Sequence, residues 1–246
     1  MAKKYKDPNN EEAYTLGKIY VKKNTSYFYK VVFYTLNVAF GYYILKDLNF
    51  LPVYLGGSGE FSNMFVNGNM DSTFLQPAYF KIYYMMYLSH NLTDLIYLIF
   101  IYEQQTDFPL MFLHHTCTIS LIFFSHITNH SHIGALVMII HDLTDIAVYF
   151  IRSRVQTDDS EPIKVCYGIS LLIIYFYTRL FVFGKLILAC YENQSDWNLM
   201  YSTLWRFMCF LYTIHCYWLF LIMKKIFNAL FKNEYSDTAS LKKQLQ

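Results

Sequence analysis

The sequence predicts an all-α membrane protein, a polytopic helical bundle with about six transmembrane helices. Composition is the first observation behind this prediction: of the 246 residues, 55% are hydrophobic and only 15% are charged, whereas soluble domains carry roughly 25% charged residues. The second is that the apolar residues are gathered into long runs. A run of about 20 apolar residues is what a helix needs to cross the hydrocarbon core of a bilayer.

Six apolar stretches have this length. They are residues 27–45, 78–102, 108–127, 133–151, 165–190 and about 200–223. Residues 46–78, between the first two stretches, are rich in glycine, asparagine and serine. Such a composition is typical of turns, so we expect an ordinary connection there. The five cysteines have neither regular spacing nor a C-x-x-C pair, and we interpret them as buried thiols.

Basic residues alternate along the chain and predict its orientation. They are gathered in the tail at 1–26, in the loop at 152–164 and in the tail at 226–246. The other connections contain a single basic residue, Lys46. Because cytoplasmic loops are enriched in lysine and arginine, we expect a multi-pass protein with both tails in the cytosol.

Residues 108–154 carry titratable side chains inside two apolar runs. His114 and His115 lie on the first run, and His141, Asp142 and Asp145 lie on the second. Ionisable groups within membrane spans are costly, so by default they are candidates for function. We predict these five residues to be the catalytic residues.

The polar break at residues 128–132 predicts a lumenal turn between two antiparallel spans. His115 and Asp145 are each 15 residues from His130, so both are expected at about 22 Å from the turn. His141 and Asp145 share a helix face because they are related by i,i+4. The group lies close to the predicted cytosolic ends of both spans, which places the site in the cytosolic half of the bilayer.

Histidines beside carboxylates support two kinds of acyl-transfer chemistry. An imidazole that is oriented by a carboxylate is a good general base for an amine or a hydroxyl. A neutral imidazole can also attack an acyl thioester and carry the acyl group itself. The sequence leaves both roles open.

Two other interpretations of the group were weighed. The first is a polar packing network that fixes the register of the helices. The second is a metal site, because His126, His130 and His132 are closely spaced. These turn histidines are about 15 residues of helix away from His114 and His115, so we expect no metal and interpret them as interfacial polar residues.

Seven further residues in and beside the spans are candidates for substrate binding. They are His90, Asp94, Arg179, His215, Trp218, Arg152 and Arg154. The last two flank the predicted cytosolic mouth, where they can attract the phosphates of a nucleotide-bearing carrier. A purely structural role stays open for six of them: ion pairing for Arg179, core packing for His215, a satisfied polar pair for His90 with Asp94, and cytosolic anchoring for the two arginines at the mouth.

The run DFPLMFLHHTCTISLIFFSHITNHSHIGALVMIIHDLTDIA resembles the signature segment of ceramide synthases, the longevity-assurance subgroup of the TLC-domain family. The resemblance rests on its D-F-x-x-M-F-x-H-H start and its H-D-x-x-D end. It extends weakly to Thr178, Arg179 and Leu180 and to the H-x-x-W of His215 and Trp218. It therefore covers about residues 78–225, which it identifies as the catalytic transmembrane domain.

The resemblance implies a sphingoid base N-acyltransferase of the endoplasmic reticulum membrane. It implies acyl-CoA as donor and co-substrate, ceramide or dihydroceramide as product, and no further cofactor. The family's essential histidine pair corresponds to His114 and His115, and its H-D-x-x-D motif to His141, Asp142 and Asp145. The expected partners are the two substrates and the bilayer, with no nucleic acid, and a homo- or heterodimer is compatible with the sequence.

The alternative function is that of a non-catalytic TLC-domain protein that binds lipids or escorts cargo out of the endoplasmic reticulum. Such relatives generally lack the full set of H-H and H-D-x-x-D motifs, and this chain has the full set.

Overall fold

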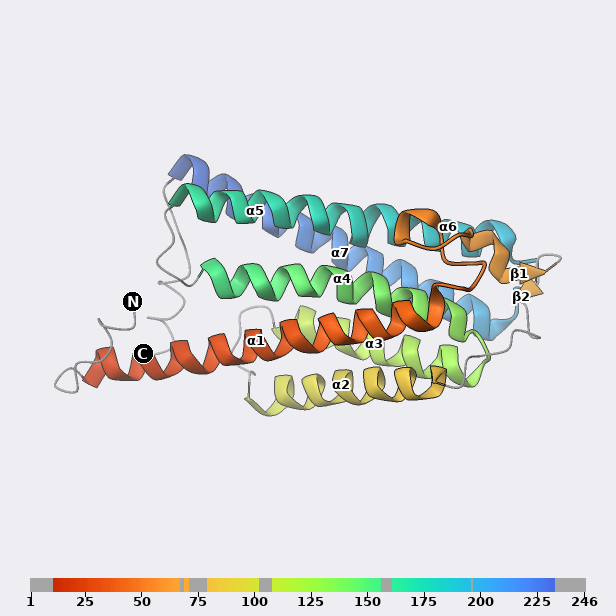
Figure 1. Cartoon of the computed structure of the whole chain (residues 1–246), viewed down its shortest axis with the longest axis horizontal. Helices are drawn as coiled ribbons and strands as arrows, with labels where there is room; N and C mark the ends of the chain where they lie inside the picture. Colours follow the sequence, from red (N-terminus) through yellow and green to blue (C-terminus); the bar gives the residue numbers. More distant parts are fainter. Residues whose placement is uncertain are drawn as a thin grey trace. The chain divides into compact units, whose positions relative to one another are not determined.

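The structure is a computed structural model that describes residues 11–66, 69–70, 79–101, 108–155, 161–195 and 197–232, and it confirms the all-α prediction (Figure 1). Its helices are α1 (Glu11–Leu45), α2 (Phe80–Ile101), α3 (Phe108–Ile127), α4 (Ser131–Val155), α5 (Glu161–Tyr175), α6 (Phe183–Asn193) and α7 (Leu199–Lys232). A π-helix, η3 (Phe176–Val182), joins α5 to α6 without a break. The predicted tails extend outside the described residues at 1–10 and 233–246.

Four helical stretches within the described residues are long and apolar enough to cross a membrane. They are Phe108–Ile127, Ser131–Val155, Pro162–Asn193 and Leu199–Asn228, and they correspond to the third to sixth predicted spans. The first two predicted spans fold as α1 and α2 but are less apolar, because both are rich in tyrosine and α2 contains the polar run Ser89, His90 and Asn91. A total of six spans stays a prediction.

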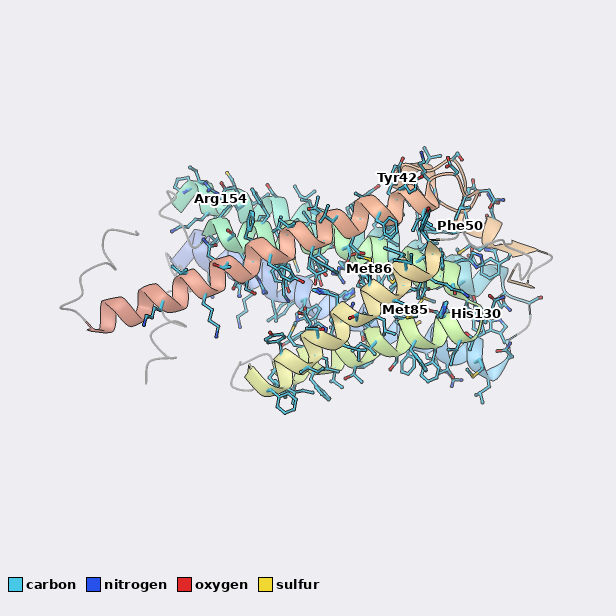
Figure 2. The ribbon with its side chains drawn as sticks, turned by 60° about the horizontal axis from the view of Figure 1, so that its bottom comes forward. Tyr42, Phe50, Met85, Met86, His130 and Arg154 are labelled. Atoms are coloured by element: carbon cyan, nitrogen blue, oxygen red, sulfur yellow. The ribbon has the colours of Figure 1, made fainter. Side chains whose placement is uncertain are left out.

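The outer faces of the helices carry large apolar side chains. Phe100 of α2, Leu199 of α7 and Phe231 of α7 are 78%, 77% and 72% exposed. Met85 and Met86, labelled on α2 in Figure 2, are also exposed. Extended apolar surfaces are rare on soluble monomers, and a lipid environment removes their cost. Together with the four apolar stretches, these faces identify a multi-pass membrane protein.

The chain folds into two compact units. One consists of Leu36–Asp142 and Tyr177–Tyr217, and the other of Met1–Thr35, Leu143–Phe176 and Trp218–Gln246. Helices α1, α4 and α7 contribute to both units. All eight histidines of the chain lie in the first unit, which we call the histidine unit. Within it, α2 and α3 pack side by side (Figure 1).

The connection after α1 has a small core of its own, so it is more than the ordinary connection that the sequence predicted. It contains the short 3-10 helices η1 (Val53–Leu55) and η2 (Phe61–Met64) and an antiparallel pair of strands, β1 (Phe65–Val66) and β2 (Asn69–Met70). Phe50, Leu51, Phe61 and Met64 are buried. Tyr42 of α1 donates a hydrogen bond to the carbonyl of Gly56 (2.8 Å), and Figure 2 shows it beside this segment. The prediction followed the glycine, asparagine and serine residues of this segment and gave no weight to the apolar residues between them.

The cysteines are all free, but only some are buried. Cys117 and Cys190 are buried and Cys209 is half-buried, whereas Cys166 and Cys216 are exposed. The expectation of five buried thiols was therefore wrong for two of them, because an apolar sequence environment does not distinguish the inner face of a helix from the outer one.

The turn between α3 and α4 forms where the polar break predicted it. Asn129 adopts a left-handed conformation (φ 62°), which asparagine tolerates better than most residues. The backbone N–H of His130 donates to the carbonyl of Ser125 (2.7 Å), and its Nδ1 bonds the hydroxyl of Thr128 (2.9 Å). Burial lowers the pKa of His130 below its usual value of 6.5.

Gly134 lets the start of α4 approach α2 and α3 closely. A Cβ atom at this position would lie 1.9 Å from the hydroxyl oxygen of Tyr84 and 2.5 Å from the Oγ of Ser125. That hydroxyl is fixed, because Tyr84 is fully buried and donates to the carbonyl of Ser131 (2.7 Å). Only glycine fits this contact.

Replacing Gly134 by alanine should destabilise the fold by about 1 to 3 kcal/mol, because the added methyl group overpacks a site that cannot yield. The matched control is Gly184→Ala, where a Cβ would meet its nearest neighbour, Tyr212, at 3.4 Å. That change should leave stability equal or slightly higher, since alanine favours helix over glycine. Thermal unfolding in detergent micelles measures both, and equal melting temperatures for the two variants would contradict the packing argument.

The buried His130 should make stability depend on pH. Its folded-state pKa lies below the unfolded value, so the unfolded chain takes up a proton first as the pH falls through about 6.5, and the folded state loses stability there. The melting temperature of the wild type should therefore fall more steeply between about pH 7.5 and pH 5.5 than that of His130→Gln. Parallel curves for the two proteins would refute this role.

Candidate active site

Four histidines and an arginine meet inside the histidine unit, and we call them the histidine cluster. His114 and His115 come from α3, His141 from α4, Arg179 from η3 and His215 from α7. The ring centroids of His141 and His215 are 4.9 Å apart. The ring of His114 lies 5.7 Å from His215, 6.4 Å from His141 and 5.5 Å from His115. The sequence prediction thus named all five members, with Arg179 and His215 as substrate-binding candidates.

Hydrogen bonds connect the inner members of the cluster. Arg179 donates from Nη1 to Nε2 of His215 (3.2 Å) and from Nη2 to the backbone carbonyl of His141 (3.1 Å). The Nε2 atoms of His141 and His215 are 2.9 Å apart, and Nδ1 of His141 donates to the carbonyl of Val137 (2.7 Å). A buried guanidinium needs such partners, since a charge removed from water without them is very costly.

The inner and outer members differ in exposure. His215, His141 and Arg179 are 0%, 2% and 3% exposed, so they are sealed from the surroundings. His114 and His115 are only half-buried. The α3 pair is therefore the more exposed part of the cluster.

The π-helix η3 supplies Arg179 and one wall of the cluster. Such segments are rare and are frequent at functional sites. Thr178, Arg179 and Val182 are its buried residues. Phe183 follows directly, and its ring lies 5.1 Å from His141 and 5.8 Å from His215. Sequence reasoning missed Phe183, because a phenylalanine in an aromatic-rich span gives no signal.

Asp142 is fully buried next to His141 in the histidine unit. Its carboxylate accepts a hydrogen bond from Nδ2 of Asn37, a buried residue of α1. Sequence reasoning also missed Asn37. A lone asparagine within the apolar run 27–45 was the available signal, because a buried amide needs a polar partner.

Four predicted site residues belong to the other unit: Asp145, Arg152, Arg154 and Trp218. Asp145 follows His141 by one turn of α4 and is half-buried. The guanidinium of Arg152 lies over the ring of Tyr149, 5.9 Å from its centroid. The pairing of His115 with Asp145 and the substrate contacts of the other three stay predictions.

His90 and Asp94 face each other across one turn of α2. The distance from Nε2 of His90 to Oδ2 of Asp94 is 3.8 Å, and both side chains are largely buried. The two side chains are therefore close enough for an ion pair when His90 is protonated, and their role in substrate binding stays a prediction.

The turn histidines are more buried than interfacial residues would be. His130 and His132 are 9% and 3% exposed, and the ring of His132 stands edge-on to Phe50 at 5.4 Å. Among the residues that the structure describes, no group of three histidine, cysteine or acidic side chains is arranged to hold a metal.

Replacing Asn37 by leucine should destabilise the protein by about 1 to 3 kcal/mol, because the buried carboxylate of Asp142 loses a hydrogen-bond donor. Asn91→Leu is the matched control: Asn91 is also buried, but its Nδ2 donates to the carbonyl of Tyr87 within its own helix (2.9 Å). Chemical or thermal unfolding in micelles should rank Asn37→Leu as the less stable variant. The opposite order would show that the bond to Asp142 contributes little.

Comparison with known proteins shows that the chain is similar to ceramide synthases of animals and a plant. The chain is 28% identical to ceramide synthase 5 of Homo sapiens over 161 residues, which are 63% of this chain and 40% of the relative. It is 28% identical to ceramide synthase 3 of Homo sapiens over 182 residues, 71% of this chain and 45% of the relative. Ceramide synthase LOH2 of Arabidopsis thaliana is 25% identical over 154 residues, 59% of this chain and 52% of the relative.

These matches span about half the length of the relatives. No solved structure matches the chain. The family model described as the TLC domain matches residues 23–224, which include the second half of α1 and every member of the histidine cluster. The chain therefore belongs to the TLC domain family.

Proposed function

We propose that this protein is a ceramide synthase, an enzyme that transfers a fatty acyl group from acyl-CoA to the amine of sphinganine or a related sphingoid base. The observation that carries the proposal is the histidine cluster, in which half-buried histidines stand beside sealed histidines and a buried arginine inside a membrane protein. Structure alone rarely needs so many titratable groups in one apolar unit, since each carries a cost there. The ceramide synthase relatives give the proposal its substrate class.

The reaction needs a group that takes a proton from the attacking amine. His114 or His115 is the candidate, because these rings are partly accessible while His141 and His215 are sealed. The amine nitrogen forms a bond to the carbonyl carbon, the carbon–sulfur bond breaks, and the amine proton passes through the imidazole to the thiolate of CoA. In the alternative course the imidazole first takes the acyl group from CoA and then gives it to the amine.

The buried residues around this pair prepare it for the reaction. Arg179 and Phe183 hold the rings of His141 and His215 in place, and Asn37 fixes the carboxylate of Asp142. A group held in one rotamer by its neighbours loses little entropy on reaching the reactive geometry. The residues around His114 therefore act through it and need no contact with the acyl group.

The proposal extends to the setting of the enzyme. We place it in the endoplasmic reticulum membrane with both termini in the cytosol, where acyl-CoA is available. The basic end of α4, with Arg152 and Arg154 in its last turn, suits the phosphates of the CoA carrier. Acyl-CoA is the co-substrate, and the reaction requires no other cofactor.

Purified protein in micelles, incubated with sphinganine and a mixture of acyl-CoA chain lengths, should produce ceramides that mass spectrometry detects. His114→Ala and His115→Ala should each lower kcat about hundredfold or more, the usual loss for a missing acid–base group. Asp145→Asn should lower it as well. His126→Ala is the control, since this histidine bonds Ser131 at the turn and should leave the rate unchanged.

Absence of ceramide at every chain length, with lipid still bound to folded protein, would contradict the proposal. That result would favour a non-catalytic protein that binds lipids or escorts cargo.

A further inference from the structure

The hydroxyl of Thr118 is buried in the histidine unit without a hydrogen-bond partner. Thr118 belongs to α3 and is 4% exposed. Among the residues that the structure describes, none makes a hydrogen bond to its Oγ1 atom. Thr93 and Thr203, by contrast, each donate to the carbonyl four residues earlier in their own helix (2.8 Å in both). A buried hydroxyl without a partner costs free energy, so its presence in a folded protein requires an explanation.

Thr118 lies one helical turn from the histidine pair of α3. It follows His114 by four residues and His115 by three, so its side chain is a neighbour of both on the helix surface. At these spacings the Cβ atoms are about 5 to 6 Å apart. A carbonyl group between the histidine pair and Thr118 can therefore place its carbon near an imidazole and its oxygen near the hydroxyl.

Thr118 also lines a small cavity of about 10 Å³, whose walls come from α2, α3, α4 and α7. Val137 and Met138 line the same cavity and precede His141 by about one turn of α4. Ser125 lies at the other end, seven residues or about 10 Å further along α3, and its hydroxyl donates to the carbonyl of Ile122 (3.0 Å). The end of the cavity nearest the histidines is therefore the end at which Thr118 supplies a hydroxyl.

This end of the cavity suits a carbonyl oxygen better than a water molecule. A buried water usually makes hydrogen bonds to two to four polar groups, whereas Leu121, Val137 and Met138 on the cavity wall have apolar side chains. A carbonyl oxygen only accepts hydrogen bonds, so one O–H donor is enough for it. The fatty acyl thioester of the proposed reaction carries such an oxygen on an apolar chain.

We infer that Thr118 is a catalytic residue, whose hydroxyl donates a hydrogen bond to the oxygen of the thioester carbonyl during acyl transfer. The inference rests on the proposed function and names a group that stabilises its transition state. A donor that is fixed in an apolar site, where charge develops, stabilises that charge far more than it would in water.

The step is balanced without any further reactant. As the amine nitrogen, or first the imidazole, forms its bond to the carbonyl carbon, the π electrons of the carbonyl move to its oxygen, which becomes negative. The hydroxyl of Thr118 stabilises this charge and keeps its own proton. When the carbon–sulfur bond breaks, the carbonyl forms again. The amine proton reaches the thiolate through the imidazole, and CoA leaves as the thiol.

Thr118→Val tests this role, because valine has nearly the shape of threonine but no hydroxyl. Its kcat should fall about hundredfold, as for loss of an oxyanion donor. KM for both substrates should stay within about twofold, since the bond strengthens only in the transition state. The melting temperature should equal or exceed that of the wild type, because an unpartnered buried hydroxyl is removed. Thr118→Ser keeps the donor and should keep kcat within about tenfold of the wild type.

Thr93→Val is the matched control, because the hydroxyl of Thr93 is exposed and bonded within α2; its kcat should equal that of the wild type. A Thr118→Val enzyme with the wild-type kcat, or one whose loss of activity follows loss of folded protein, would overturn the inference and leave the proposed function intact. Equal losses of kcat in Thr118→Val and Thr118→Ser would overturn it as well, since the hydroxyl would not be the decisive group. A wild-type protein that makes no ceramide would overturn both.

Discussion

The positive charge of Arg179 is the constraint on which the histidine unit depends. A guanidinium that is 3% exposed in an apolar unit must find acceptors within reach, because an unpaired buried charge costs several kcal/mol. Two of its acceptors are the carbonyl of His141 and the ring of His215. Both contacts require η3, α4 and α7 to converge at one depth, and Arg179 is one of the buried residues of η3. Arg179 thereby ties the ring of His215 to the backbone of His141.

The first half of α4 is the central element that makes this convergence possible. Every residue from 130 to 142 is buried, so no face of this stretch is exposed. The small residues Gly134 and Ala135 admit neighbours closely, as the contact with Tyr84 shows. A helix that is enclosed in this way can seal His141 and Asp142 at one end while its other end is fixed by the turn. Burial of His141 and Asp142 and tight packing at Gly134 are thus consequences of the same enclosure.

The positions of the helices could be predicted from the sequence, because membrane helices are apolar runs between polar breaks. Helix α3, for example, begins and ends at the predicted residues. Sequence reasoning named the histidines and Arg179 because charged groups in such runs are costly. It did not find Asn37, Phe183 or the π-helix, since none of these follows from hydropathy or from the helix rise. Depth along a helix was predictable, but rotation about its axis was not. The prediction therefore set His115 opposite Asp145, and it had no means of expecting the ring of His114 beside those of His141 and His215, one from each of two other helices.

The division of the chain into two units also gives each unit its own reporter. All eight histidines lie in the histidine unit, and so do four of the five cysteines. The other unit has one thiol, Cys166, and it is exposed. A label on that thiol, read beside histidine resonances, would follow the two halves of the protein separately. Whether they unfold together or in sequence is thereby open to measurement once the exposed Cys216 is replaced.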